Sequence, residues 1–321
     1  MKNLLALLLL SFLTTTLSFC QTRPAPYVHP EGKYYTINGA KIWTETLGNG
    51  HPLFLIAGGP GSSHVGLHSF DPLADNHKLI YFDGFGRGKS DLAKNPTEYS
   101  LQRDVEDLEQ LRIGMGLGKI DILGHSYGSV VGQAYAIKYP HNVSHLIIAN
   151  GFHSYLMWQK NCDNSNHEIK TNYPEVWDTL MTVREQGFIS ADPIHQEIYG
   201  RVPYGFLYSY NPDKFRGPSR FSDYPNRMNT ELYYQMVGKD GDFVVTSDIG
   251  TFDFRRDIGK LNMPILVIAG RYDRVAVPSE MVKYKNFCPK CEYVTFERSG
   301  HNPQVEEPEK EFNLINEFLA K

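Results

Sequence analysis

The sequence predicts an α/β fold, in which helices cover both faces of a mostly parallel β-sheet and one helical lid is inserted. Three observations predict this fold class. Short apolar runs recur along the chain, segments with apolar residues at helical spacing separate them, and one aromatic stretch interrupts the alternation. Strands that alternate with helices favour a parallel sheet covered on both faces.

Composition and charge exclude several classes of protein. The chain has 321 residues, of which 41% are hydrophobic and 21% charged, and 32 Lys and Arg stand against 36 Asp and Glu. A net charge of −4 is too small and too evenly balanced to indicate a nucleic-acid partner. Four cysteines are too few for a small fold held together by disulfides.

The first twenty residues have the three-part layout of a secretory signal. Met1 to Asn3 is short and basic, Leu4 to Leu13 is nearly all apolar, and small and polar residues follow up to Cys20. The apolar run is too short to remain as a membrane-spanning helix, and no later run approaches that length. We therefore expect residues 1–20 to be a removable signal and the mature chain to be periplasmic or secreted.

The end of this signal admits two interpretations. Leu17-Ser18-Phe19-Cys20 resembles a bacterial lipobox, which would leave a lipid anchor on Cys20, although Phe19 is large where a small residue is usual. Alternatively, cleavage falls after Cys20, with Ser18 and Cys20 as the small residues before the cut. The sequence favours simple export over lipidation.

Each element of the sheet has a local sequence signal. A hairpin turned by Asn38-Gly39 is expected to join strands at 33–37 and 40–46. Buried strands are expected where short apolar runs end in loop-forming residues, at 52–57, 78–82, 120–123, 145–149, 264–269 and 293–296. Apolar residues at helical spacing predict helices over 101–111, 130–137 and 312–318.

A segment without strand–helix rhythm lies between two of these strands. It spans residues 152–251 and is rich in Trp, Tyr and Phe, so we expect a lid that encloses a substrate. The hydrolase core would then comprise residues 21–151 and 252–321. The chain is long enough for two domains, but we expect one fold with an insertion.

Ser126 is the expected nucleophile. It lies in Gly124-His125-Ser126-Tyr127-Gly128, directly after a predicted strand and before a predicted helix. This is the G-x-S-x-G pattern in the strand–turn–helix context that it needs, because the turn is too tight for larger side chains beside the serine.

Asp273 and His301 are the expected partners of Ser126. A serine hydroxyl needs a base to take its proton, and the base needs an acid to orient it. Asp273 follows the strand at 264–269, and His301 follows the last strand, so both project from the sheet edge that presents Ser126. The order Ser, acid, His is typical of hydrolases with this motif.

The oxyanion of the reaction needs N–H donors fixed in advance. Ala57-Gly58-Gly59-Pro60-Gly61 follows the first parallel strand, where bare backbone can turn its amides toward a carbonyl oxygen. We expect the backbone N–H groups of Gly59 and Tyr127 to be the donors.

Together these residues resemble the α/β-hydrolase superfamily, and within it the proline iminopeptidases and the tricorn interacting factor aminopeptidase. Gly58-Gly59-Pro60-Gly61 matches the HGGPG motif of these enzymes, except that Ala57 replaces its His. The segment 83–90 is similar to their DQxGxGxS motif, and the stretch from Tyr234 to Asp242-Phe243 is similar to their lid-exit region. The resemblance runs from about Lys33 to the C-terminus and is weakest over 152–227.

The resemblance implies the α/β-hydrolase fold and the release of N-terminal residues, often proline, from short peptides. It also implies lid carboxylates that hold the free α-amine of the substrate. Asp242 stands where these enzymes usually have Glu, and Glu197 is the candidate for a second carboxylate. The reaction needs no metal and no organic cofactor, so we expect neither in catalysis.

Two other functions are compatible with parts of the pattern. A carboxylesterase or related acyl hydrolase would use the same triad on a different substrate. A non-catalytic small-molecule-binding protein would be expected to have a broken triad or oxyanion loop, and neither is broken here. Epoxide hydrolases and haloalkane dehalogenases are disfavoured because they need Asp at the position of Ser126.

The remaining cysteines contain one close pair. Cys288-Pro289-Lys290-Cys291 is a lone CxxC that precedes the predicted strand at 293–296. Because a redox-active pair would be expected at a helix N-terminus after a strand, this pair indicates a structural disulfide or no function.

Overall fold

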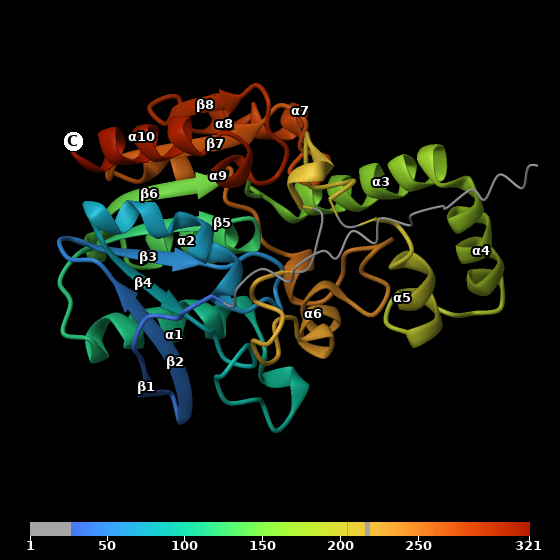
Figure 1. Cartoon of the computed structure of the whole chain (residues 1–321), viewed down its shortest axis with the longest axis horizontal. Helices are drawn as coiled ribbons and strands as arrows, with labels where there is room; N and C mark the ends of the chain where they lie inside the picture. Colours follow the sequence, from blue (N-terminus) through green and yellow to red (C-terminus); the bar gives the residue numbers. More distant parts are fainter. Residues whose placement is uncertain (1–26, 204, 216–218) are drawn as a thin grey trace, which may run out of the picture.

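A computed structural model describes residues 27–203, 205–215 and 219–321. It contains an eight-stranded sheet with strand order β1-β2-β4-β3-β5-β6-β7-β8 (Figure 1). The predicted signal at residues 1–20 and the possible lipid anchor at Cys20 lie outside the described residues. The strands are β1 (Gly32–Ile37), β2 (Ala40–Leu47), β3 (Pro52–Ile56), β4 (Lys78–Phe82), β5 (Ile120–His125), β6 (Val143–Ala149), β7 (Ile265–Gly270) and β8 (Glu292–Phe296).

The sheet is parallel except at one edge. β1 pairs with β2 and β2 with β4 in antiparallel fashion, whereas every pairing from β4 to β8 is parallel. Asn38 and Gly39, both with positive φ, turn the β1–β2 hairpin as the sequence predicts. All eight predicted strands are confirmed, with boundaries that differ by at most two residues.

Helices cover both faces of the sheet. In β3, Phe54 and Ile56 pack in the same core as helices α1 (Leu101–Gly114) and α2 (Tyr127–Lys138). Leu53 and Leu55 pack on the other face with helices η1 (His64–Asp75) and α10 (Pro308–Leu319). This alternation is the two-residue period of a strand that is buried on both sides. The predicted α/β fold, a mostly parallel sheet with helices on both faces, is therefore confirmed.

The helices lie between consecutive strands, and several of them belong to one long segment between β6 and β7. They are η1 (His64–Asp75), η2 (Pro96–Glu98), α1 (Leu101–Gly114), α2 (Tyr127–Lys138), η3 (Pro140–Asn142), α3 (Tyr155–Asn172), α4 (Pro174–Glu185), α5 (Pro193–Tyr199), η4 (Pro212–Phe215), α6 (Thr230–Val237), η5 (Asp248–Gly250), η6 (Ile258–Lys260), α7 (Pro278–Met281), α8 (Tyr284–Phe287), α9 (Pro303–Glu306) and α10 (Pro308–Leu319). Polar side chains cap several N-termini: Ser100 accepts a hydrogen bond from the backbone of α1, Ser154 from α3 and Asn229 from α6.

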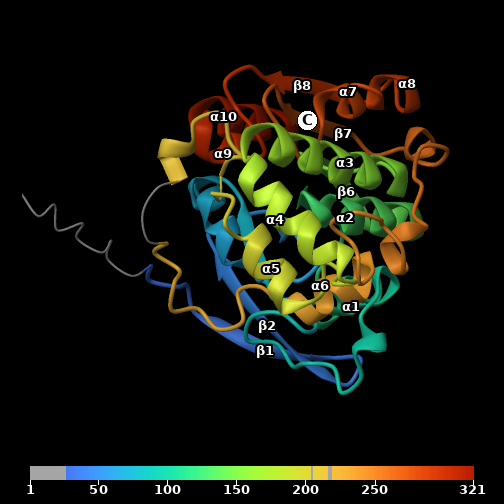
Figure 2. The ribbon, with the colours of Figure 1, turned by 90° about the vertical axis from the view of Figure 1, so that its right-hand side faces the viewer.

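The long segment between β6 and β7 lies beyond the carboxyl ends of the parallel strands. Figure 1 shows α3 to α6 on the side of the sheet toward which the strand arrows point, and Figure 2 shows the same helices across that end of the molecule. The loops that follow β5, β7 and β8 therefore face this group of helices.

The described cysteines comprise one disulfide pair and one free thiol. Cys288 and Cys291 form a disulfide directly before β8, and Cys162 is a buried free thiol in α3. Over the described residues, none of the helices combines the length and the apolar character needed to cross a membrane.

Candidate active site

Ser126 occupies a one-residue turn between β5, which ends at His125, and α2, which begins at Tyr127. Its φ of 57° and ψ of −122° lie in a backbone region that residues other than glycine rarely adopt, so the turn is strained. The neighbouring glycines are needed because a Cβ atom on Gly124 would overlap the backbone of Gly128, and one on Gly128 would overlap the carbonyl of Ile56. The motif thus brings Ser126 to the carboxyl end of the sheet.

Asp273 and His301 meet across the same end of the sheet. The Asp273 Oδ2 atom lies 2.8 Å from His301 Nδ1, and both side chains are almost completely buried. A carboxylate only accepts hydrogen bonds, so Nδ1 donates and the ring orientation is fixed. The other ring nitrogen, Nε2, is buried and has no hydrogen-bond partner among the described residues, which leaves it available to take a proton.

Three further donors hold the Asp273 carboxylate. Asn150 Nδ2 donates to Oδ2 across 2.9 Å, and the backbone N–H groups of Val275 and Ala276 donate to Oδ1 across 2.8 and 2.9 Å. Burial alone would raise the pKa of this carboxyl, but the charge of His301 and these hydrogen bonds hold the pKa below its ordinary value. Asp273 is therefore set to remain ionised.

Sequence reasoning missed two residues that support this pair. Asn150 has a φ of 47° directly after β6 and also donates to the carbonyl of Gly300, which precedes His301. His125 Nε2 donates to the carbonyl of His301 across 2.8 Å. Burial, with the charge of His301, lowers the pKa of His125 to about 4, so this ring is neutral. The only signal of these contacts in the sequence is the Asn150-Gly151 pair that follows the predicted strand at 145–149.

Ser126 and His301 line one cavity of about 480 Å³. Gly58 and Gly59 line it as well, together with aromatic residues that include Trp158, Tyr208 and Tyr233. The backbone carbonyl of Tyr208 accepts a hydrogen bond of 2.8 Å from the N–H of His301, which ties the segment between β6 and β7 to the His301 loop. The cavity therefore combines the serine, the histidine and the glycine-rich loop.

The two expected oxyanion donors come from segments that adjoin Ser126. Gly58 is so close that a Cβ atom there would lie 2.8 Å from the Cβ of Ser126, and Gly59, with a φ of 45°, follows it in the same loop. Tyr127 is the first residue of α2, so its backbone N–H is one that the helix itself does not use. These positions are compatible with the predicted oxyanion site.

Asp242 lines a second cavity, of about 330 Å³, that adjoins the first. Asn161, Tyr208 and Tyr233 line both cavities, so the two cavities meet at these side chains. Tyr234 donates a hydrogen bond of 3.0 Å to Asp242 Oδ2. Burial raises the pKa of Asp242 to about 6 in spite of this bond. A buried carboxylate without a cationic partner close to it is well suited to receive a cation.

Glu197 does not reach either cavity. Its side chain, on α5, is 72% exposed and pairs with Arg201 across 3.0 Å on the surface of the same helix. The structure therefore brings Asp242 toward Ser126 but does not bring Glu197 there, because Glu197 lies on the solvent-facing side of α5.

The fold agrees with comparisons to known proteins. A profile of the alpha/beta hydrolase fold family matches residues 51–308. The chain therefore belongs to the alpha/beta hydrolase fold family. A proline iminopeptidase from Heyndrickxia coagulans is 30% identical to it over 274 residues, which make up 85% of this chain and 91% of the relative.

Solved structures show the same architecture. The crystal structure of VinJ superposes with a TM-score of 0.78 at 20% identity and covers 91% of this chain and 99% of that one. The crystal structure of a proline iminopeptidase from Mycobacterium smegmatis has a TM-score of 0.75 at 20% identity, over 90% of this chain and 98% of that one. At these identities the likeness shows the fold alone, so the activity must be argued from the site.

Proposed function

We propose that this chain is an exported serine aminopeptidase that releases N-terminal residues, proline among them, from short peptides. The observation that carries the proposal is the position of Asp242, a mostly buried carboxylate in a cavity that adjoins the one that Ser126 lines. The relatives named proline iminopeptidase support the same substrate class.

The reaction would begin at the Ser126 hydroxyl. His301 Nε2 takes its proton while Asp273 keeps the ring oriented, and Ser126 Oγ attacks the carbonyl of the first peptide bond. The N–H groups of Gly59 and Tyr127 stabilise the oxyanion, a contribution of about 3 kcal/mol for each donor. His301 then protonates the leaving amine, and water hydrolyses the acyl-enzyme with His301 again acting as the base.

Asp242 would select for a free N-terminus. An α-ammonium group that enters the second cavity finds a carboxylate without a nearby cationic partner and several tyrosines, including Tyr199 and Tyr233. An N-blocked peptide offers no charge to this carboxylate and leaves it buried and unpaired, which costs several kcal/mol. The preference for a free N-terminus would therefore depend on the pairing of the substrate ammonium group with Asp242.

The helices α3 to α6 would act as the lid of this site. They contribute Trp158, Asn161 and Tyr233 to the first cavity, and they lie across the carboxyl ends of the strands (Figure 2). A lid in this position would exclude the middle of a long peptide. This arrangement favours a small first residue with a short remainder.

Export is proposed on two grounds. Residues 1–20 have the layout of a secretory signal, and the Cys288–Cys291 disulfide suits an oxidising compartment. The mass of the mature N-terminus tests this directly. Simple cleavage gives an unmodified peptide that starts after the signal, and a lipid-modified Cys20 would replace it if the chain is anchored.

A panel of four substrates tests the activity. Prolyl-, alanyl- and N-acetylprolyl-naphthylamide are compared with p-nitrophenyl acetate. We expect prolyl-naphthylamide to be cleaved about 100-fold or more faster than its N-acetyl derivative, because only the free amine pairs with Asp242. Equal rates for the two would overturn the recognition of the amine, and activity on the ester alone would identify a carboxylesterase instead.

A further inference from the structure

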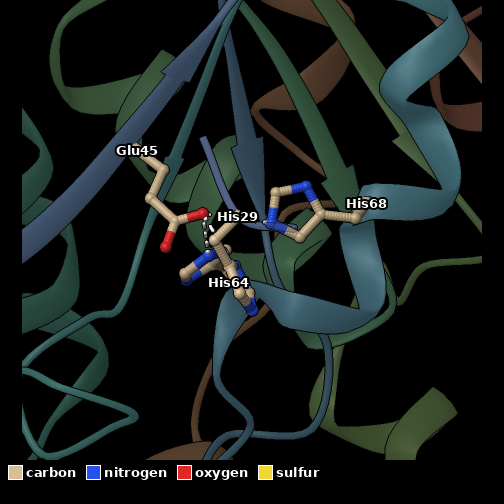
Figure 3. A group of neighbouring side chains, drawn as sticks. All are labelled: His29, Glu45, His64 and His68. Carbon is tan, nitrogen blue, oxygen red and sulfur yellow. Dashed lines mark hydrogen bonds and ion pairs between the residues drawn. The ribbon is translucent and has the colours of Figure 1, made fainter. Parts of the chain in front are cut away.

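A compact group of three histidines and one glutamate lies outside the active-site cavity. His29 precedes β1, Glu45 belongs to β2, and His64 and His68 lie one turn apart on η1 (Figure 3). We call these four residues the histidine cluster. The side chains of Glu45, His64 and His68 are completely buried, and that of His29 is 24% exposed.

The ring nitrogens of this cluster converge on one atom. Glu45 Oε2 lies 3.0 Å from His29 Nδ1, 3.3 Å from His64 Nε2 and 3.2 Å from His68 Nε2. In a tetrahedral zinc site with bonds of about 2.0–2.1 Å, neighbouring ligand atoms are separated by about 3.3 Å. All four ligand atoms lie within 4.8 Å of one another, so a bound ion needs to draw the rings together only slightly.

Two of the ring nitrogens contact Glu45 at ion-pair distance without forming a well-aligned hydrogen bond. His64 Nε2 and His68 Nε2 are buried, and neither has a hydrogen-bond partner of acceptable geometry among the described residues. A buried polar atom without a partner costs about 1–3 kcal/mol, and here two of them point at the same carboxylate. A ligand that accepts electron pairs from both nitrogens would remove this cost.

The opposite nitrogens of the same rings are held by carboxylates. His64 Nδ1 lies 2.8 Å from Asp83 Oδ1, and His68 Nδ1 lies 2.9 Å from Asp71 Oδ1. Because a carboxylate only accepts, each Nδ1 carries a hydrogen, and Nε2 is the ring atom directed into the cluster, where a bound ion would replace any proton that it holds. Carboxylates in this position are the usual outer partners of metal-bound histidines.

A hydrogen bond from outside the cluster also orients the carboxylate of Glu45. Trp43 Nε1 donates a hydrogen bond of 2.9 Å to Glu45 Oε1, which leaves Oε2 for the three histidines. The outer carboxylates are fixed as well, since Tyr224 donates to Asp83 across 2.6 Å and Tyr81 donates to Asp71 across 2.7 Å. The cluster is therefore built in two layers, as metal sites are.

We propose that His29, Glu45, His64 and His68 bind a divalent transition-metal ion of the zinc class, in a tetrahedral site with three nitrogen ligands and one oxygen ligand. This set of ligands suits zinc, and with four protein ligands the site is closed to substrate. The site is structural, so the catalytic reaction still needs no metal.

The ion would join three parts of the chain that are far apart in sequence. It connects the segment before β1 to β2 and to η1, which begins three residues after Gly61 of the glycine-rich loop. Asp83, the outer partner of His64, lies in the loop after β4. The metal would thereby fix the N-terminal segment and the helix that follows the proposed oxyanion loop.

Metal analysis of the full chain, produced without a histidine tag, tests the proposal. The protein is treated with EDTA, incubated with Zn²⁺, desalted and analysed for zinc by mass spectrometry. We expect about one zinc per chain in the wild type and about tenfold or more less in His68→Gln and in His29→Gln. His77→Gln serves as the control, because His77 lies just beyond η1 and its Nε2 is 2.9 Å from Asn316 Oδ1 rather than in the cluster.

Two further measurements separate loss of the ligand from loss of the fold. His29 is partly exposed, so His29→Gln should retain the wild-type circular dichroism spectrum while losing zinc. Cobalt(II) in place of zinc should give the intense visible absorption of a tetrahedral site in the wild type and in His77→Gln only. A wild type that retains no zinc, or the same zinc content in all four proteins, would overturn the proposal.

Discussion

Tyr234 donates its hydroxyl hydrogen to Oδ2 of Asp242 across 3.0 Å, inside the cavity that adjoins Ser126. Among the described residues, His195 is the basic side chain paired with Asp242, and its Nδ1 lies 4.0 Å from Oδ2. Burial lowers the pKa of His195, so this ring is neutral near pH 7 and does not neutralise the carboxylate. The charge of Asp242 is therefore left for the substrate.

The first prediction concerns the pH dependence of amine recognition. Burial raises the pKa of Asp242 to about 6, so its carboxylate becomes charged as the pH rises through that value. The ratio of kcat/KM for prolyl-naphthylamide to kcat/KM for p-nitrophenyl acetate should rise about tenfold between pH 5 and pH 7. Taking the ratio cancels the titration of the groups that both reactions share.

Two variants complete this measurement. In Asp242→Asn the ratio should be low and independent of pH, because no charge develops in the cavity. Asp163→Asn, which removes an exposed carboxylate from α3, should behave like the wild type. A pH-independent ratio in the wild type would exclude Asp242 as the group that binds the amine.

The same pKa shift makes a separate prediction about stability. The pKa of Asp242 is raised in the folded state from 3.8, so its contribution to stability is fully present below about pH 4 and is lost as the pH rises through about 6. At pH 8, Asp242→Asn should therefore be more stable than the wild type, by at most about 3 kcal/mol. Urea unfolding at pH 4 and pH 8 measures this, and equal differences at the two pH values would contradict the burial of a charged Asp242.

Replacement of Asp273 tests the orientation of His301. Asp273→Asn keeps the size of the side chain but lets the amide donate to His301 Nδ1, which favours the wrong tautomer of the ring. We expect kcat for prolyl-naphthylamide to fall about 10⁴-fold with KM nearly unchanged. Asp257→Asn, which removes a partly exposed carboxylate paired with Lys260, is the matched control. Retention of more than a tenth of the wild-type kcat in Asp273→Asn would refute this role.

A single methyl group tests the packing of the glycine-rich loop on the serine. In Gly58→Ala the new Cβ would lie 2.8 Å from Ser126 Cβ and 3.3 Å from Ser126 Oγ, so one of the two residues must move. Displacement of a reacting group by about 1 Å costs on the order of 100-fold in rate. Gly118→Ala, where a Cβ meets nothing within 4 Å, should leave kcat unchanged. Equal kcat values for both variants would show that Gly58 does not position Ser126.

The sequence predicts the sheet well because its signals are local. Each buried strand is a short apolar run such as Leu53 to Ile56, and the G-x-S-x-G turn needs only five consecutive residues. The order Ser, Asp, His then places Asp273 and His301 at the carboxyl ends of neighbouring strands, and the structure brings this pair to 2.8 Å.

Other features depend on how distant segments meet, and the sequence alone does not contain that information. The sequence offers Glu197 as a second carboxylate for the substrate amine. The orientation of α5 directs this side chain to solvent, where it pairs with Arg201. The histidine cluster joins residues from three separate segments, and only the spacing of His64 and His68 could have indicated it. Asn150 becomes meaningful only when β6 and β7 lie side by side.

The central claim is that Ser126 is the nucleophile of an aminopeptidase, and Ser126→Ala tests it most directly. We measure kcat/KM for prolyl-naphthylamide in the wild type, in Ser126→Ala and in Ser222→Ala, which removes an exposed hydroxyl far along the chain. We expect a loss of about 10⁴-fold or more in Ser126→Ala and none in Ser222→Ala. A Ser126→Ala enzyme that cleaves prolyl-naphthylamide at the wild-type rate would contradict the central claim.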